Sequence, residues 1–154
     1  MEKIFFYDTP IGRVGIAEED GSLTQVTFQT ALPAGAVLEE TPLIVQCRQE
    51  LDEYFKGERK TFDLPLCPKG TEFQKKVWSA LREIPYGETR AYGEIAAAVG
   101  NPKAARAVGM ANNRNPISVI VPCHRVIGSD GKLVGYGGGL DKKEFLLALE
   151  RENR

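Results

Sequence analysis

The sequence predicts an α/β amino-terminal domain, an antiparallel sheet with one helix, and a mainly helical carboxy-terminal domain. Residues 3–28 alternate apolar and polar side chains, as strands with one buried face do. Residues 42–57 and most of the chain after residue 70 instead repeat apolar residues three and four apart, the spacing of amphipathic helices. Composition and charge change near Pro68, so we expect domains at 1–68 and 69–154.

The overall composition is that of a globular protein. Of the 154 residues, 42% are hydrophobic and 27% are charged. A chain of this length and composition can bury a hydrophobic core. No apolar run is long enough to cross a membrane, and the start 'MEKIFFYDTPIG' lacks a signal-peptide pattern. We therefore expect a cytoplasmic protein with no membrane partner.

Charge is distributed unequally between the two predicted domains. Residues 1–68 hold 6 Lys and Arg against 12 Asp and Glu, a net charge of −6, whereas residues 69–154 hold 14 against 9, a net charge of +5. The second domain is the one that suits a phosphate backbone. A chance scatter of charges is the alternative.

The amino-terminal elements follow from turn and stop signals. Asp20-Gly21 separates two strand-like runs and predicts a hairpin. A helix over 42–57 ends at Gly57, and 61–70 is interpreted as a strand and then a linker. The helix has one apolar face, formed by Ile44, Cys47, Leu51, Tyr54 and Phe55.

Four helices are expected in the second domain. The first, over 71–85, has Thr71 as its N-cap, and the apolar stripe Phe73, Val77, Trp78, Leu81 and Ile84. Two short Ala-rich helices follow across Gly100, the second with Asn101 as cap and Pro102 at its first position. This pair suggests a helix-turn-helix, although many helical hairpins bind nothing. The last helix covers 142–154.

The three cysteines differ in setting. Cys47, Cys67 and Cys123 are odd in number and far apart, which argues against a disulfide framework. With one histidine and no Cys-x-x-Cys pair, a zinc site is not expected either. Cys47 is expected in the core, and Cys67, beside Pro68, is interpreted as structural.

Cys123 and His124 form the one sequence-adjacent thiol and imidazole. A thiol reacts as thiolate, and apolar surroundings keep it protonated, so Cys123 needs an ionising partner. Neighbours on an extended chain point in opposite directions, so a water relay or a bent backbone would have to connect the two. The imidazole would then need a carboxylate, for which Glu150 is the best candidate. The alternative is that Cys123 is core and Glu150 surface.

The motif 'PCHRVIG' resembles the active-site signature of the O6-alkylguanine-DNA alkyltransferases, also called methylated-DNA–protein-cysteine methyltransferases. The segments 'GTEFQKKVWSALREIPYGETRAYGEIAAAVG', 'ARAVGMANNRNPI', 'GYGGGL' and 'KKEFLLALE' resemble the family in order and spacing. Together they cover nearly all of residues 70–150. The segments 'TPIGRVGIA' and 'GSLTQVTF' resemble its more variable amino-terminal domain.

The resemblance implies an activity and a fold. It implies a ribonuclease H-like first domain and a winged helix-turn-helix-like second domain. The alkyl group of O6-alkylguanine in duplex DNA, with O4-alkylthymine as a further candidate, would pass irreversibly to Cys123. The target base would be flipped out, and each monomer would bind the minor groove and react once, without cofactor or metal.

The resemblance also implies residue roles. Cys123 matches the nucleophile, His124 the water-relayed base, Glu150 the carboxylate behind it, Asn115 a turn residue, and Tyr92 a proton donor to the leaving base. Arg106 matches the side chain that fills the gap left by the base, which a planar guanidinium suits. The expected DNA contacts are Arg106, Ala105, Ala107, Gly109, Met110, Ala111 and Arg114. The expected base pocket comprises Tyr136, Gly137, Gly138, Lys143 and Val126.

Two departures from the family pattern concern stability and substrate range. Ala91 stands where many relatives have Ser or Thr, so a helix cap worth roughly 1 kcal/mol is missing. Gly137 stands where some have Ser, which removes a hydroxyl from the pocket.

Three rival interpretations remain: a non-catalytic lesion-binding relative, which would lack the reactive cysteine, a cysteine hydrolase, and a transcription factor without chemistry.

Overall fold

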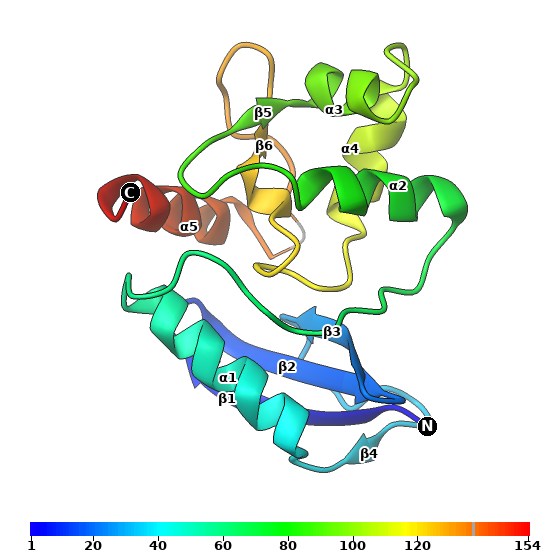
Figure 1. Cartoon of the computed structure of the whole chain (residues 1–154), viewed down its shortest axis with the longest axis vertical. Helices are drawn as coiled ribbons and strands as arrows, with labels where there is room; N and C mark the ends of the chain where they lie inside the picture. Colours follow the sequence, from blue (N-terminus) through cyan, green and yellow to red (C-terminus); the bar gives the residue numbers. More distant parts are fainter. Residues whose placement is uncertain (137) are drawn as a thin grey trace. The chain divides into compact units, whose positions relative to one another are not determined.

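The computed structural model of the chain describes residues 1–136 and 138–154. It divides the chain into two compact units, Met1–Lys69 with Pro116–Ser118, and Gly70–Asn115 with Val119–Arg154 (Figure 1). Residues 116–118 join the first unit because they pair with Val26. The Val26 N–H donates to the Pro116 carbonyl at 2.9 Å, and the Ser118 N–H donates to the Val26 carbonyl at 3.0 Å. The composition-based division 1–68 and 69–154 puts these three residues in the second domain.

The first unit is built on a four-stranded sheet in the order β3-β2-β1-β4. Its strands are β1 (Lys3–Thr9), β2 (Gly12–Glu19), β3 (Ser22–Thr27) and β4 (Val37–Leu38). β1, β2 and β3 form an antiparallel meander. Asp20 and Gly21 both have positive φ, 52° and 81°, as a type I′ turn requires, so the predicted hairpin is confirmed.

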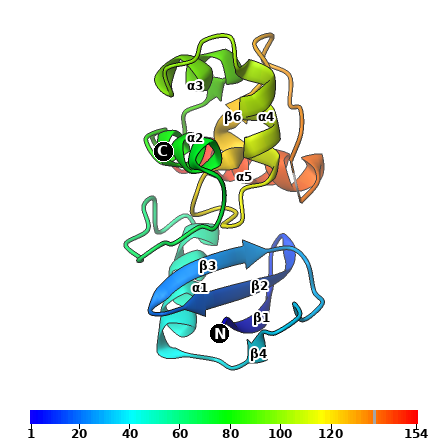
Figure 2. The same cartoon turned by 90° about the vertical axis from the view of Figure 1, so that its right-hand side faces the viewer.

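One helix covers one face of this sheet. α1 (Pro42–Phe55) packs on β1, β2 and β3, and Figure 2 shows it behind the three strands. Its predicted face is confirmed, because Ile44, Cys47, Leu51 and Tyr54 are buried and Phe55 is half-buried. Gly57 has φ 76° and ends the helix, as predicted.

Two expectations for this unit are corrected. Residues 61–70 do not form a strand: Leu66 alone makes a bridge, to Leu23, because Pro65 and Pro68 on either side have no N–H to donate. β4 was not expected. It pairs in parallel with Lys3 and Ile4 at the sheet edge.

The second unit is mainly helical, which confirms the coarse two-part architecture. It contains α2 (Glu72–Leu81), β5 (Arg90–Ala91), α3 (Tyr92–Ala98), α4 (Ala105–Asn113), η1 (Cys123–Arg125), β6 (Val126–Ile127) and α5 (Leu140–Glu152). α2, α3 and α4 pack against one another around Val77, Trp78 and Val108. The Trp78 Nε1–H donates to the Ala111 carbonyl at 2.8 Å, which ties α4 to α2.

The start of α4 differs from the prediction. Asn101 and Pro102 form a separate turn, closed by the Ala104 N–H to the Asn101 carbonyl at 3.0 Å. Proline favours the second position of such a turn, so the helix begins three residues later than expected, at Ala105. β5 and β6 were not expected either. They pair in parallel, Arg90 with Val126 and Ala91 with Ile127.

The last helix also differs in detail. α5 begins at Leu140, two residues earlier than expected, and on it Phe145 is 40% exposed whereas Leu146 is buried. Across the part of the chain that the structure describes, no helix has the length and apolar character needed to span a bilayer.

The N-caps of α2 and α3 provide a matched test of local stability. Thr71 accepts from the Gln74 N–H at 3.1 Å, whereas Ala91 has no side-chain acceptor and only its N–H is satisfied, by Glu94 at 2.9 Å. Thr71→Ala should lower the free energy of unfolding by about 1 kcal/mol, and Ala91→Ser should raise it by about 0.5–1 kcal/mol. Urea unfolding would measure both, and equal signs for the two changes would contradict this account.

Candidate active site

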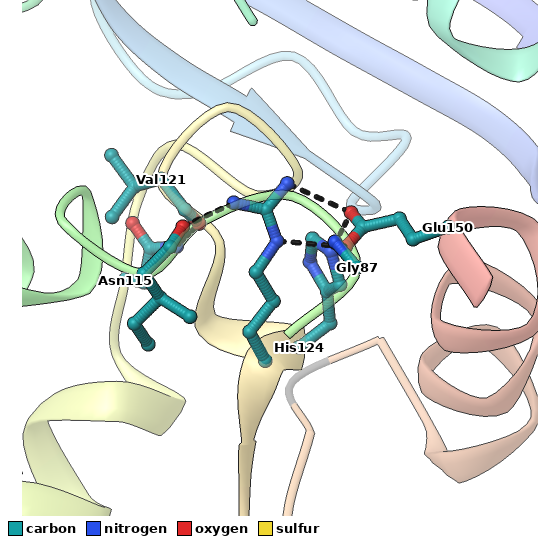
Figure 3. Close-up of polar contacts among 7 residues, drawn as sticks. Gly87, Asn115, Val121, His124 and Glu150 are labelled. Atoms are coloured by element: carbon teal, nitrogen blue, oxygen red, sulfur yellow. Dashed lines mark hydrogen bonds and ion pairs between the residues drawn. The ribbon is translucent and has the colours of Figure 1, made fainter. Parts of the chain in front are cut away.

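The site is built on the short turn η1, which follows a strained backbone. Val119 has φ 71°, a conformation that is costly for a β-branched residue. The Asn115 Nδ2–H donates to the Val121 carbonyl at 2.8 Å and so holds the segment just before Pro122 (Figure 3). The chain then turns at Pro122, and the Arg125 N–H donates to the Pro122 carbonyl at 3.0 Å. The bent backbone considered from the sequence is therefore a 3₁₀ turn.

Cys123, His124 and Arg125 are all buried within this turn, with exposed fractions of 3%, 0% and 7%. Successive residues of a 3₁₀ turn project about 120° apart, so the three side chains enter different surroundings. Those of His124 and Arg125 meet a carboxylate from α5.

That carboxylate belongs to Glu150, which is 1% exposed. Its Oε2 lies 2.6 Å from His124 Nε2, and the Gly87 N–H donates to its Oε1 at 3.2 Å (Figure 3). Arg125 adds a bidentate pair, Nε to Oε1 at 2.8 Å and Nη2 to Oε2 at 2.9 Å. The alternative of a surface Glu150 is therefore wrong.

Glu150 is ionised in this setting. Burial alone would raise its pKa, but the hydrogen bonds and charges of His124 and Arg125 outweigh burial and hold the pKa far below its usual range. Arg125 is further fixed by donating from Nη1 to the Ile84 carbonyl at 2.7 Å. A buried charge is tolerated when it is paired and hydrogen-bonded in this way.

The charge on Glu150 determines the tautomer of His124. A carboxylate only accepts, so the short contact requires Nε2 to carry the proton. Burial lowers the pKa of His124, against the opposing effect of Glu150, so the imidazole is neutral and Nδ1 is its basic nitrogen. Nδ1 is buried and has no hydrogen-bond partner among the described residues. It is available to accept a proton.

Cys123 is a thiol in the resting state. Burial raises its pKa to about 11, although hydrogen bonds from Asn115 and Tyr136 and the charge of Lys143 lower it in part. Because the thiolate is the nucleophile, the reaction requires a base, and His124 Nδ1 is a base whose conjugate acid is held by a carboxylate.

Lys143 and Tyr92 both contact the loop between β6 and α5. The buried Lys143 Nζ donates to the carbonyls of Val126 (2.5 Å), Val134 (2.9 Å) and Gly135 (3.2 Å). The Tyr92 hydroxyl donates to the same Val134 carbonyl at 2.9 Å. Lys143 therefore positions the loop as well as favouring the Cys123 thiolate, and burial lowers its own pKa to about 8.

The other residues expected in a base pocket are only partly described. Tyr136 and Val126 are buried, and Gly138 is half-buried. Gly137 lies outside the described residues.

The expected DNA contacts lie on α4 and at its end. Arg106, Met110 and Arg114 are exposed and four residues apart, so they share one helix face. Ala107 is exposed, and Ala105 and Gly109 are half-buried. Ala111 is 2% exposed and its carbonyl accepts from Trp78, and its contact with DNA stays a prediction.

Within residues 1–136 and 138–154, no group of three or more His, Cys, Asp or Glu side chains is arranged to hold a metal ion.

Comparison with known families assigns both units. Residues 72–152 match the family described as 6-O-methylguanine DNA methyltransferase, DNA binding domain, and residues 4–68 match its ribonuclease-like domain. The chain belongs to the 6-O-methylguanine DNA methyltransferase family. The resemblance seen in 'PCHRVIG' and its neighbouring motifs is thereby confirmed.

Individual members of this family match over nearly the whole chain. The methylated-DNA–protein-cysteine methyltransferase of Methanosarcina acetivorans is 55% identical over 148 residues, which are 94% of this chain and 95% of that protein. The constitutive enzyme of the same name from Bacillus subtilis is 51% identical over 152 residues, 94% of this chain and 92% of that protein.

A solved family member has the same fold. The Mycobacterium tuberculosis OGT in complex with DNA is 46% identical, with a TM-score of 0.92, covering 98% of this chain and 94% of that one.

Two buried side chains at the site were not assigned a role from the sequence. Arg125 follows His124 directly, and that position in 'PCHR' was the available signal. Asn112 donates from Nδ2 to the Cys123 carbonyl at 3.2 Å. Its signal was a polar residue on the inner side of an amphipathic helix, facing the same way as Val108.

Arg125 can be tested through stability. Arg125→Met keeps most of the side-chain volume but leaves the Glu150 charge without its bidentate partner, so it should lower the free energy of unfolding by about 3–5 kcal/mol. The matched control Arg151→Met, exposed on α5, should change it by less than about 0.5 kcal/mol. Equal effects in urea unfolding would show that Arg125 does not stabilise the buried carboxylate.

Proposed function

We propose that this protein repairs DNA by transferring the alkyl group of O6-alkylguanine to Sγ of Cys123, with O4-alkylthymine as a second candidate substrate. The proposal rests above all on one arrangement: a buried thiol next in the chain to a neutral imidazole whose Nε2–H is held by Glu150 at 2.6 Å. The names of the relatives and the DNA-bound solved relative support it. We also propose a ribonuclease H-like first unit and a winged helix-turn-helix-like second unit.

The first step is removal of the thiol proton. His124 Nδ1 takes this proton from Cys123, through a water where the two atoms do not touch. The imidazolium that forms lies beside the Glu150 carboxylate, which stabilises the new charge. The proton therefore moves toward a buried negative charge, which offsets the high pKa of the thiol.

The second step is displacement at the alkyl carbon. The thiolate forms the S–C bond as the bond from the alkyl carbon to O6 breaks, and guanine leaves with the electron pair of that bond. The Tyr92 phenol can supply the proton that neutralises the leaving base, once its hydroxyl is released from the Val134 carbonyl. Tyr92 then recovers a proton from the imidazolium or solvent.

The product limits each molecule to one reaction. Water does not displace the Cys123 thiolate from the alkyl carbon of a thioether, and His124 and Glu150 give no means of cleaving that S–C bond. The protein would be consumed stoichiometrically.

Access to O6 requires the base to leave the duplex, at a cost of a few kcal/mol. Arg106 is exposed on α4 and can fill the vacated position. The small residues Ala107 and Gly109 on the same helix permit close approach to a groove, and a sequence-independent role fits the minor groove. We also propose that the protein binds DNA as a monomer and acts in the cytoplasm.

Mass spectrometry of the intact protein tests the transfer. After incubation with a duplex containing O6-methylguanine, one methyl group should be found on Cys123, and reaction should stop at one per protein. Cys123→Ala should bind the same duplex without gaining mass. An unchanged wild-type mass with retained binding would instead indicate a non-catalytic lesion-binding protein.

The role of Arg106 can be separated from the chemistry. Arg106→Ala should slow repair of the duplex by about 10-fold or more, because the gap left by the flipped base stays unfilled. Reaction with free O6-benzylguanine should be nearly unchanged. The exposed Arg82→Ala at the end of α2 serves as control, and equal losses on both substrates would exclude the proposed role.

A further inference from the structure

Asn112, in the last turn of α4, is directed inward toward the reacting turn. It is 1% exposed, and its Nδ2 donates to the Cys123 carbonyl at 3.2 Å. A carbonyl can only accept, so this contact fixes the orientation of the amide, with nitrogen toward Cys123. The helix that carries Arg106 thus holds the peptide group of the nucleophile.

The same amide also contacts Tyr92. A hydrogen bond with Asn112 lowers the pKa of Tyr92, whereas burial and the charge of Cys123 raise it. The Tyr92 hydroxyl donates its one proton to the Val134 carbonyl, and Asn112 Oδ1 has no hydrogen-bond partner among the described residues, so the phenol oxygen is the acceptor and the Asn112 amide nitrogen the donor. The phenol proton is directed elsewhere, to the Val134 carbonyl at 2.9 Å.

Asn112 therefore joins the two groups that react with the substrate. One contact reaches the backbone of Cys123, the proposed nucleophile, and the other reaches the Tyr92 phenol, the proposed proton donor to the leaving base. Glu150, on α5, holds His124 from a different element.

The amide oxygen of Asn112 indicates that packing alone does not explain an asparagine at this position. Asn112 Oδ1 is buried and has no hydrogen-bond partner among the described residues. An unsatisfied buried acceptor disfavours the folded state, and an apolar side chain of the same size would avoid that cost. Such an oxygen, beside the nucleophile, is suited to a donor that arrives with the substrate or as a water.

We propose that Asn112 is a positioning residue for alkyl transfer. It fixes the Cys123 peptide and the Tyr92 phenol relative to each other and to α4, the helix proposed to bind DNA. The inference rests on the proposed function. Misplacing either group by about 1 Å is enough to slow a displacement about 100-fold.

Two variants and a matched control test it. Asn112→Leu keeps the size of the side chain and removes the amide. Asn112→Asp keeps the shape but replaces the donor by a carboxylate beside the Cys123 carbonyl and the Tyr92 phenol. Asn113→Asp makes the same change one position along α4, on an exposed side chain. Single-turnover rates would be measured against pH with free O6-benzylguanine, together with melting temperatures.

Both Asn112 variants should transfer about 10- to 100-fold more slowly than wild type. Asn112→Asp should also shift the pH of half-maximal rate upward, because a new negative charge disfavours the Cys123 thiolate. Asn113→Asp should match wild type in both respects. A purely structural role would lower the melting temperature without moving the pH profile.

A double-mutant cycle with Tyr92→Phe completes the test. If Asn112 acts through the phenol, Asn112→Leu should cost a smaller factor in the Tyr92→Phe background than in wild type. Equal factors in both backgrounds, or wild-type rates and pH profiles for both Asn112 variants, would overturn the inference. Wild-type protein that gains no alkyl group on Cys123 would overturn the proposed function instead.

Discussion

The ionised carboxylate of Glu150 is the interaction on which the rest of the site depends. A charge buried to this extent is stable only with partners on every side, and the chain supplies three partner residues from two segments: His124 and Arg125 on η1, and the Gly87 N–H after α2. Satisfying Glu150 therefore fixes the position of η1 against α5. It also sets the tautomer of His124, and with it the nitrogen that can take a proton.

The three cysteines show why burial alone does not select a nucleophile. Burial raises the pKa of Cys47 to about 12, with Glu50 adding to the effect. Cys67 is exposed. Cys123 is as buried as Cys47, but hydrogen bonds from Asn115 and Tyr136 and the charge of Lys143 oppose the rise in its pKa. The reactive thiol is distinguished by its donors, and without a base it stays protonated and inert.

How much of the fold and of the site could be predicted from the sequence depended on how far apart in the sequence the interacting residues lie. Local patterns were sufficient for α1, α2 and the Asp20-Gly21 hairpin, because periodicity and turn chemistry act within a few residues. They were insufficient for β5 and β6, two-residue strands paired between Arg90 and Val126. Cys123 and His124 were evident as neighbours, and Glu150 was the favoured carboxylate from its place on the last helix before the family resemblance matched it to the same role. Arg125 was missed because its partners, Ile84 and Glu150, lie 41 and 25 residues away.

The pairing of residues 116–118 with β3 has a consequence for how the molecule is made. The first unit is not a continuous piece of chain: Ile117 is fully buried in it, yet it follows α4 in the sequence. During synthesis on the ribosome, chains emerge from the amino terminus, so Val26 must wait for its partners until α2, α3 and α4 have been made. Residues 116–118 are therefore the last part of the first unit to be added, although its four strands are translated first.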